Sequence, residues 1–331
     1  MPDLLVASNT RLSRTQLRDS LGRVRFAGPL AALLLAVVAF SVTTSTFLTG
    51  SNLSLILQQS VVIGMLALGQ TLIILTAGID LANGAIAVLA SVVMAKLVFH
   101  DHDPVAALLV GMAVAVLLAG ISGVLVTRLH LPPFIVTLGM LTVVTATARL
   151  YTGSSSFPVG SDLLVWLGHA VSLGSFTFTY GTVLWLAAYV AAGYVLTQTA
   201  WGVRVFAVGN NREAARLAGV KVDQVLLSVY VAAGFCYALA AWEMLGRVPN
   251  ADPSGYASAN LDSITAVVIG GTSLFGGRGG VAGTLIGVLI VTVLRNGLTQ
   301  AGIDSLYQDV TTGVLVVAAV AVDQLVRRRQ R

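Results

Sequence analysis

The chain has 331 residues, of which 56% are hydrophobic and only 10% charged, whereas about half of an average soluble domain is apolar and about a quarter is charged. Together with a mean hydropathy of +0.88, this composition excludes an ordinary soluble enzyme and places the chain in a lipid bilayer. The net charge of +5 comes largely from arginines that flank the apolar blocks. Because no basic stretch is interleaved with aromatic residues, we expect no nucleic-acid partner.

A helix that crosses the hydrocarbon core needs about 20 apolar residues, and ten stretches have the composition of such a helix or of a shorter, interrupted one. They are residues 26–47, 55–76, 84–99, 105–126, 133–150, 182–197, 224–245, 264–274, 281–298 and 310–326. The sequence therefore predicts an all-α, polytopic membrane protein with about ten transmembrane helices. The transmembrane domain, residues 26–326, lies between a basic N-terminal segment, residues 1–25, and a basic tail, residues 327–331.

Lysine and arginine are distributed unevenly over the two sides that ten crossings create. With both termini inside, 15 of the 19 cationic residues lie on the inner side, and cytoplasmic segments carry such an excess. The exceptions are Lys96, Arg149, Arg247 and Arg295. We therefore expect both termini in the cytoplasm.

Two of the ten helices border glycine-rich, polar stretches, residues 78–84 (GIDLANG) and 270–280 (GGTSLFGGRGG). Backbone that leaves a helix at membrane depth must be buried in protein or line a water-filled cavity. These stretches thus predict a substrate path, with hinges at Gly78, Gly84, Gly270, Gly271, Gly276 and Gly277. The alternative is that the glycines only allow helices to pack closely.

Polar residues in and beside these stretches are candidates for the wall of that path: Gln70, Asp80, Asn83, Asp262 and Ser273. An ionisable group within the membrane costs about 3 kcal/mol on insertion scales unless it is paired or hydrated. Asp80 is compatible with a wall of the path and also with a plain cap of the following helix, and the sequence leaves both open. Glu243 precedes Arg247 by four residues, which predicts a local ion pair.

The side-chain inventory does not support an enzyme. The histidines, His100, His102, His130 and His169, all fall in short loops, so that a membrane-buried serine has no general base. The chain has no GxxxxGK[ST] motif with which to bind a nucleotide. Residues 100–103 (HDHD) form one short turn, which favours a solvated loop over a metal site. We expect neither a metal nor a cofactor on this chain.

The longest inner loop, residues 199–223, contains a sequence typical of a short helix, VGNNREAARLAGV (residues 208–220). Asn210 suits the N-cap position, Glu213 the N3 position of a capping box, and Gly219 the end of the helix.

A helix of this phase places Ala214, Leu217 and Ala218 on one face, with Arg212 and Arg216 on a solvated one. A small-residue face outside the membrane is suited to docking on a partner. The alternative is an amphipathic connection that lies on the lipid surface. On the outer side, residues 151–181 are long for a loop, and a short helix over residues 163–167 is expected to form part of a platform for a binding protein.

Three segments, in chain order, closely resemble the permease subunits of bacterial ABC importers of the ribose, xylose, galactose and fructose type. They are LGQTLIILTAGIDLANGAIAVLAS (residues 68–91), GVRVFAVGNNREAARLAGV (202–220) and LDSITAVVIGGTSLFGGRGGVAGTLIGVLIVTVLRNGL (261–298). One departure is visible, since Ala82 and Asn83 stand where the family usually has a small hydroxyl and an apolar residue. The added amide suggests recognition of another polyol pattern.

The resemblance implies a dimeric permease of the bacterial inner membrane that works by alternating access. A separate ATPase subunit would hold ATP and Mg²⁺, and a periplasmic binding protein would deliver the sugar. The residues that match the family's coupling helix and its flanks, which dock on the ATPase, are Asn210, Asn211, Glu213, Ala214, Ala215, Leu217, Ala218 and Gly219.

Two other function classes compete with this interpretation. An ion-coupled secondary transporter of a small polar solute needs a relay of intramembrane carboxylates, for which only Asp80, Glu243 and Asp262 are available. The other is a membrane scaffold that transports nothing.

Overall fold

The computed structural model describes residues 14–328, so that residues 1–13 of the predicted N-terminal segment and residues 329–331 of the tail lie outside the described part. Long helices account for most of it. The helices are α1 (Arg14–Thr43), α2 (Gly50–Leu75), α3 (Asn83–Phe99), α4 (Pro104–Arg128), α5 (Pro133–Thr152), α6 (Asp162–Val165), α7 (Tyr180–Gln198), α8 (Ala200–Asn210), α9 (Arg212–Leu217), α10 (Val222–Arg247), α11 (Ala259–Ile269), α12 (Val281–Gln300) and α13 (Ser305–Arg328), with a 3-10 turn η1 (Trp166–Gly168). The strands are β1 (Phe157–Pro158), β2 (Ala170–Leu173), β3 (Phe176–Thr179) and β4 (Asn250–Ala251).

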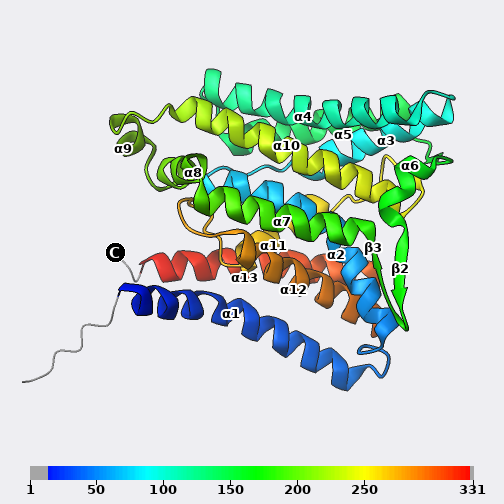
Figure 1. Ribbon diagram of the computed structural model, residues 1–331, viewed down its shortest axis with the longest axis horizontal. Helices are drawn as coiled ribbons and strands as arrows, with labels where there is room; N and C mark the ends of the chain where they lie inside the picture. Colours follow the sequence, from blue (N-terminus) through cyan, green and yellow to red (C-terminus); the bar gives the residue numbers. More distant parts are fainter. Residues whose placement is uncertain (1–13, 329–331) are drawn as a thin grey trace, which may run out of the picture.

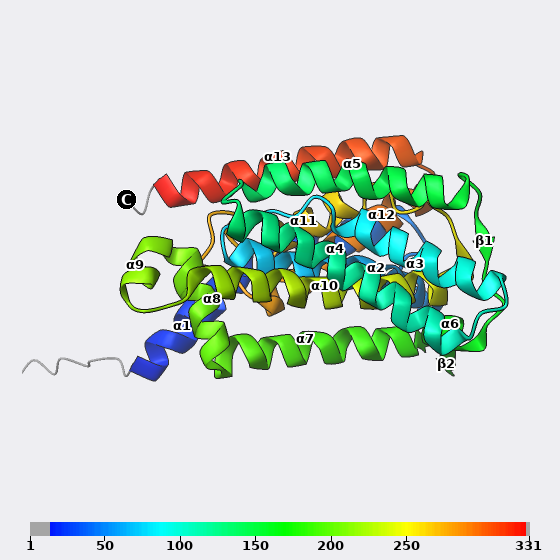
Figure 2. The ribbon, with the colours of Figure 1, turned by 90° about the horizontal axis from the view of Figure 1, so that it is seen from above.

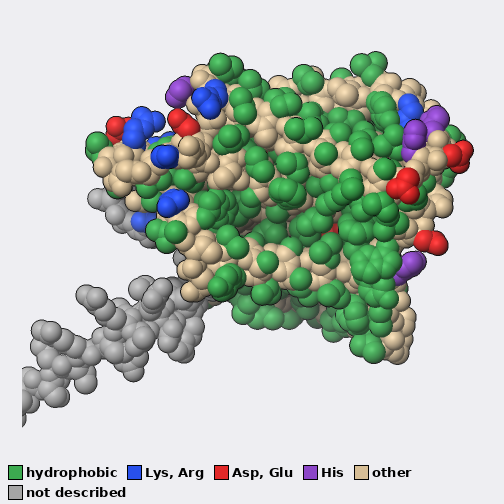
Figure 3. All heavy atoms as spheres, turned by 45° about the horizontal axis from the view of Figure 1, so that its top comes forward, with side chains coloured by type: hydrophobic (Ala, Val, Ile, Leu, Met, Phe, Trp, Pro, Cys, Tyr) green, Lys and Arg blue, Asp and Glu red, His purple; other side chains and the backbone are tan. Residues whose placement is uncertain are grey.

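The long helices lie side by side along the longest axis of the molecule (Figures 1 and 2). Helices α8 and α9 lie at one end, which we call the basic end, and α6, η1 and the strands lie at the other, which we call the strand end. Lysine and arginine side chains gather at the basic end, whereas apolar side chains cover the surface between the two ends (Figure 3). This division is typical of a protein that spans a membrane.

Six helices of the described part are long and apolar enough to cross a membrane, namely α2, α4, α5, α7, α10 and α12. Three shorter apolar helical stretches accompany them: Ala27–Thr43 of α1, α3 and α11. The all-α, polytopic class predicted from the sequence is therefore confirmed. The number of ten crossings stays a prediction.

Several helix bounds differ from the sequence prediction, and for α2 and α11 the reasons are local. Helix α2 begins at Gly50 rather than residue 55, because the Thr49 hydroxyl accepts a hydrogen bond from the Asn52 N–H at 3.3 Å and so caps it. Helix α11 covers residues 259–269 rather than 264–274. It ends there because Gly271 has a φ of +86° and takes the chain out of the right-handed region.

Helix α2 lies in the core and is joined to α12 by polar contacts along its length. Asn52 donates to Asn296 at 3.0 Å, the hydroxyls of Ser60 and Thr292 are 2.8 Å apart, and those of Thr71 and Thr284 are 2.7 Å apart. Such bonds between helices in an apolar environment fix their register.

Candidate functional site

The first glycine-rich stretch is a non-helical segment, residues 76–82, between α2 and α3. Its backbone turns at Ala77, which has a φ of +60°. Thr76, Gly78, Asp80 and Ala82 are buried, while Ile79 and Leu81 are half-buried. The segment therefore lies within protein, as backbone outside a helix must when no water can satisfy its polar groups.

Asp80 is fully buried, and its carboxylate is bonded on both oxygens. Oδ1 accepts a hydrogen bond from the Ala82 N–H at 2.8 Å, and Oδ2 accepts one from the Tyr237 hydroxyl of α10 at 3.0 Å. The Gln70 amide, oriented with its nitrogen toward the Asp80 carbonyl oxygen, donates to that oxygen at 3.0 Å and accepts from the Asp80 N–H at 3.2 Å. Asp80 thus fixes the turn before α3, and the N-cap residue of α3 is Ala82, which offers no side-chain bond.

Asn83 joins the start of α3 to the start of α11. Its Nδ2 donates to the Ser263 hydroxyl at 2.7 Å, and its Oδ1 accepts from the Gly84 N–H at 2.6 Å. Asn260 donates in return to the Leu81 carbonyl oxygen at 3.1 Å. Gln70, Asp80 and Asn83 therefore form one buried polar cluster. Nothing in the sequence singles out Tyr237, Asn260 or Ser263, because these residue types are common in helices.

The other two predicted path residues lie outside this cluster. Asp262 of α11 is 2.9 Å from Arg295 of α12. Ser273 is half-buried in the loop that follows α11, where its N–H donates to the Arg278 carbonyl oxygen at 2.9 Å.

The predicted ion pair between Glu243 and Arg247 is wrong. Glu243 is 2% exposed, and neither of its carboxylate oxygens has a hydrogen-bond partner. Arg247 is exposed at the end of α10 and contacts Tyr256 instead. The spacing of one helical turn brings the two residues to the same side of α10, but the tertiary partner of Arg247 decides where its side chain lies.

The second glycine-rich stretch crosses the ends of α2 and α8, and we call this crossing the glycine junction (Leu75, Gly209, Gly276 and Gly277). The Gly277 N–H donates to the Leu75 carbonyl oxygen at 3.0 Å. A Cβ on Gly209 would overlap that same carbonyl group, and one on Gly276 would lie 2.7 Å from the Gly209 oxygen. Gly276 and Gly277 also have φ values of +79° and +70°.

The glycines predicted as hinges therefore differ in what they do. A Cβ on Gly270 would overlap the Gly283 carbonyl group of α12, and one on Gly78 would lie 2.9 Å from the Ile73 side chain. These two, with Gly276 and Gly277, allow close packing, which the alternative interpretation expected. A Cβ on Gly84 would make only near-ordinary contacts, at 3.3 Å or more, and Gly271 serves the turn after α11.

The loop at the basic end holds two helices, α8 and α9, rather than one. The N-cap of α9 is Asn211, whose side chain accepts from the Ala214 N–H at 3.0 Å. The prediction of Asn210 as the cap is wrong by one residue, because Asn210 is the last residue of α8. Glu213 accordingly forms no capping box and lies 3.8 Å from Arg216. Gly219, with a φ of +81°, follows the end of α9 as predicted.

Helix α9 presents its small-residue face to the outside. Ala214, Leu217 and Ala218 are exposed, and Leu217 is 83% exposed, whereas Ala215 is buried against the rest of the chain. Arg212 is exposed, as the sequence suggests, but it also makes a tertiary contact: its Nη2 donates to the Thr76 carbonyl oxygen at 3.2 Å. Helix α9 is thus tied to the end of α2 next to the glycine junction.

At the strand end, α6, η1 and the β2–β3 hairpin form what we call the platform. A short helix was expected over residues 163–167, and α6 with η1 occupies residues 162–168. The Trp242 indole N–H of α10 donates to the Leu163 carbonyl oxygen at 3.1 Å. A Cβ on Gly168 would overlap the Gly246 carbonyl group, so η1 rests directly on the backbone of α10.

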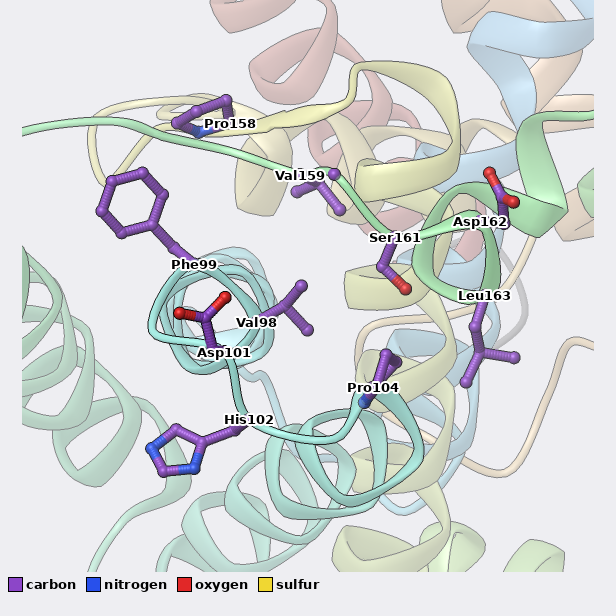
Figure 4. Close-up of a pocket in the computed structure, with 11 residues that line it drawn as sticks. Val98, Phe99, Asp101, His102, Pro104, Pro158, Val159, Ser161, Asp162 and Leu163 are labelled. Carbon is purple, nitrogen blue, oxygen red and sulfur yellow. The ribbon is translucent and has the colours of Figure 1, made fainter.

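A cleft of about 840 Å³ separates the platform from the turn between α3 and α4. Asp101 and His102 lie on the turn side, and Ser161 and Leu163 point into the cleft from the other side (Figure 4). Within residues 14–328, no group of three or more His, Cys, Asp or Glu side chains is placed to hold a metal ion.

Comparison with known proteins gives consistent results. A family model described as "Branched-chain amino acid transport system / permease component" matches residues 52–320. The chain is 43% identical to the fructose import permease protein of Rhizobium meliloti, over 91% of this chain and 85% of the relative. It is 37% identical to the ribose import permease protein of Bacillus subtilis, over 90% and 92% of the two chains. For the galactose/methyl galactoside import permease protein of Escherichia coli the identity is 35%, over 90% and 93%. No solved structure gives a significant match.

Proposed function

Because the chain belongs to the family of transport-system permease components that matches residues 52–320, we propose that it is the membrane-spanning subunit of an ATP-driven importer of a monosaccharide. Its similar proteins are import permeases for fructose, ribose and galactose. The structural observation that carries the proposal is α9, whose small-residue face is exposed while Arg212 ties the helix to the end of α2. Such a helix transmits force from an ATPase that docks on it, and that ATPase would hold the ATP and Mg²⁺.

The basic end faces the cytoplasm in this proposal. Arg204, Arg212, Arg216 and Lys221 lie in α8, α9 and the loops beside them, and cytoplasmic segments are enriched in such residues. Ten crossings by α1–α5, α7 and α10–α13 then place both termini on the same side. The membrane would be the bacterial inner membrane.

A second copy, or a related permease, would cover a face that includes α5 and α13. Figure 2 shows both helices along the same side of the molecule, α5 packed on α3 and α4 and α13 on α11 and α12. Thr142 and Arg149 of α5 are exposed, and the Asp309 side chain of α13 is 54% exposed. Polar groups on helices of this length are costly against lipid, so we assign this face to the dimer interface and its alternating-access path.

The platform and the cleft beside it would receive the periplasmic binding protein. The hairpin exposes Leu173 at 66%, and the cleft is large enough to admit a loop of a partner. An apolar residue held out on rigid strands is a suitable contact for a transient complex.

The ion-coupled alternative finds less support in the geometry. Asp80 is bonded to Tyr237, and Asp262 is paired with Arg295. Glu243 lies in a different small cavity, lined by Gln58 and Thr179 among others. Three carboxylates with separate surroundings do not form the chain of exchanging groups that a proton relay requires.

The test is uptake into proteoliposomes that hold the permease, the ATPase and internal ATP, with the binding protein outside. We expect radiolabelled fructose, ribose or galactose to accumulate only when ATP and the binding protein are both present. A protonophore and a sodium ionophore are the controls, and they should leave uptake unchanged. Uptake that needs an ion gradient and no ATP would instead establish the secondary transporter.

A further inference from the structure

A second cavity at the strand end lies between α2, α11, α12 and α13 and has a volume of about 200 Å³. We call it the strand-end cavity. It is lined by polar side chains from six different segments, among them Gln59, Arg247, Tyr256, Asp262, Arg295 and Gln308. The volume corresponds to about seven waters at roughly 30 Å³ each, which is of the order of one monosaccharide.

Arg295 is the central cation of the cavity, and part of its guanidinium has no partner. Its Nη2 is 2.9 Å from Asp262 and 3.1 Å from Asp309, and it donates to the Ser258 hydroxyl at 3.0 Å. Its Nε is buried without a hydrogen-bond partner. A guanidinium offers five N–H donors in a fixed plane, so Arg295 retains a donor for a further acceptor.

Asp262 is the complementary acceptor. Its side chain is 3% exposed, and its Oδ1 makes no hydrogen bond of good geometry, although it lies 2.9 Å from Arg295. A buried carboxylate oxygen in this condition costs free energy unless a further donor reaches it. The Arg295 guanidinium and the Asp262 carboxylate therefore lie next to each other in one cavity, and each has an atom, Nε and Oδ1 respectively, without a hydrogen-bond partner.

The charges around the cavity balance, which decides the class of ligand. Arg247, Arg295 and Asp262 line the cavity, and Asp309, which is 3.1 Å from Arg295, brings the total to two positive and two negative charges. In surroundings without net charge, neither an anion nor a cation is bound more tightly through electrostatic attraction. A neutral ligand with vicinal hydroxyls, each able to donate and to accept, matches them.

The backbone at the rim is also unusual. Tyr256 has a φ of +54°, a strained conformation for a bulky residue and one that is concentrated at functional sites. It holds the Tyr256 ring between the strand-end cavity and a neighbouring cavity of about 100 Å³ beside α3 and α5.

We propose that the strand-end cavity is a weak monosaccharide site, in which sugar hydroxyls accept from Arg295 and donate to Asp262. This inference rests on the proposed import function and adds a place at which the sugar is held inside the permease itself. Weak binding is required, because a transport site must release its cargo in each cycle.

Binding is tested on the permease alone in lipid nanodiscs, without ATPase or binding protein. Saturation-transfer NMR is recorded with D-fructose, D-ribose and D-galactose as probes, and with gluconate and glucosamine as charged controls. We expect at least one neutral sugar to give a signal that the charged analogues do not. Tyr256→Phe should weaken that binding about tenfold, or ~1.4 kcal/mol. Tyr307→Phe, at a 69% exposed tyrosine of α13, is the matched control and should bind normally. No signal from any sugar, or equal effects of both substitutions, would overturn the proposal.

A second variant separates sugar binding from a purely structural ion pair. In Asp262→Asn the charged acceptor is removed, while Arg295 keeps its pair with Asp309 at 3.1 Å. We expect thermal stability close to that of the wild type, with the sugar signal weakened about tenfold or lost. A stable Asp262→Asn variant that binds sugar as the wild type does contradicts the proposal. Uptake measurements distinguish failure of the import function from failure of the sugar site. Absence of uptake by the wild type refutes the import function. Normal uptake by Tyr256→Phe and Asp262→Asn refutes only the sugar site.

Discussion

The N–H of Gly277 donates to the carbonyl oxygen of Leu75 at 3.0 Å, and it thereby joins the loop after α11 to the end of α2. Gly209 of α8 packs against the same carbonyl group, with no room for a Cβ between them. Three chain segments far apart in sequence thus meet through backbone atoms alone. Since Arg212 binds the next carbonyl group, that of Thr76, a displacement of α9 reaches both glycine-rich stretches directly.

Gly209→Ala should disrupt this junction. The new methyl group would overlap the Leu75 carbonyl group, and overpacking of this kind costs about 1–3 kcal/mol. We expect a lower midpoint of thermal unfolding in detergent and a loss of uptake. The control is Gly193→Ala in α7, where a Cβ meets nothing within 4 Å; it should be neutral or stabilise the protein slightly. Equal midpoints for the two variants would show that the junction relaxes at no cost.

Ala214→Glu should leave the permease folded and remove its ATPase. Ala214 is exposed on α9, and a carboxylate in a dry contact without a counter-charge costs several kcal/mol. The measurement is co-purification of the ATPase, together with uptake. Arg216→Ala, which removes only an exposed pair with Glu213 at 3.8 Å, is the control and should retain the ATPase. Arg212→Ala should keep the ATPase but reduce uptake, because it releases α9 from Thr76. If Ala214→Glu binds its ATPase normally, docking uses another face.

Tyr237→Phe should lower the free energy of unfolding by about 1.5–3 kcal/mol, because it removes the hydroxyl that donates to the buried Asp80 carboxylate at 3.0 Å. Glu243→Gln should have no such effect, or should stabilise the protein, because the Glu243 carboxylate is buried without a partner. Denaturant or thermal titration of both variants in the same detergent checks the contrast. A larger loss in Glu243→Gln than in Tyr237→Phe would mean that Glu243 carries a partner of its own.

Two charged substitutions at opposite ends of the molecule should have opposite effects. Leu173→Asp, on the 66% exposed position of the platform hairpin, should weaken association with the sugar-loaded binding protein and leave the ATPase bound. Leu217→Asp, on the 83% exposed position of α9, should do the reverse. Pull-down of both partners with both variants gives four results. Loss of the binding protein in Leu217→Asp alone would invert the proposed orientation.

Periodicity and composition were sufficient to predict the helices, because apolar stretches of membrane length allow few other folds. The prediction failed where tertiary contacts decide local geometry. Asn210 and Asn211 are equally good caps in sequence, and only the extension of α8 to Asn210 shows that Asn211 is the cap of α9. Glu243 and Arg247 have the spacing of an ion pair, but Tyr256 competes for Arg247.

For the polar candidates too, the sequence indicates which residues need a partner, but tertiary packing decides which partner they find. Asp80 stood out because a charge in an apolar region demands a partner, yet the sequence does not reveal that Tyr237, 157 positions away, supplies it. Arg295 carries a comparable signal, as an arginine within an apolar helix, but the sequence places it only at the outer end of that helix. Its position between Asp262 and Asp309 follows from the packing of α11 and α13 against α12.

The contact of Gly168 with Gly246 bears on the order of events in a transport cycle. No side chain separates the two backbones, since a Cβ on Gly168 would overlap the Gly246 carbonyl group. A carrier that shifts η1 on docking must also shift the last turn of α10, and with it Arg247 at the wall of the strand-end cavity. Arrival of the carrier and reshaping of the cavity wall would then occur in one step.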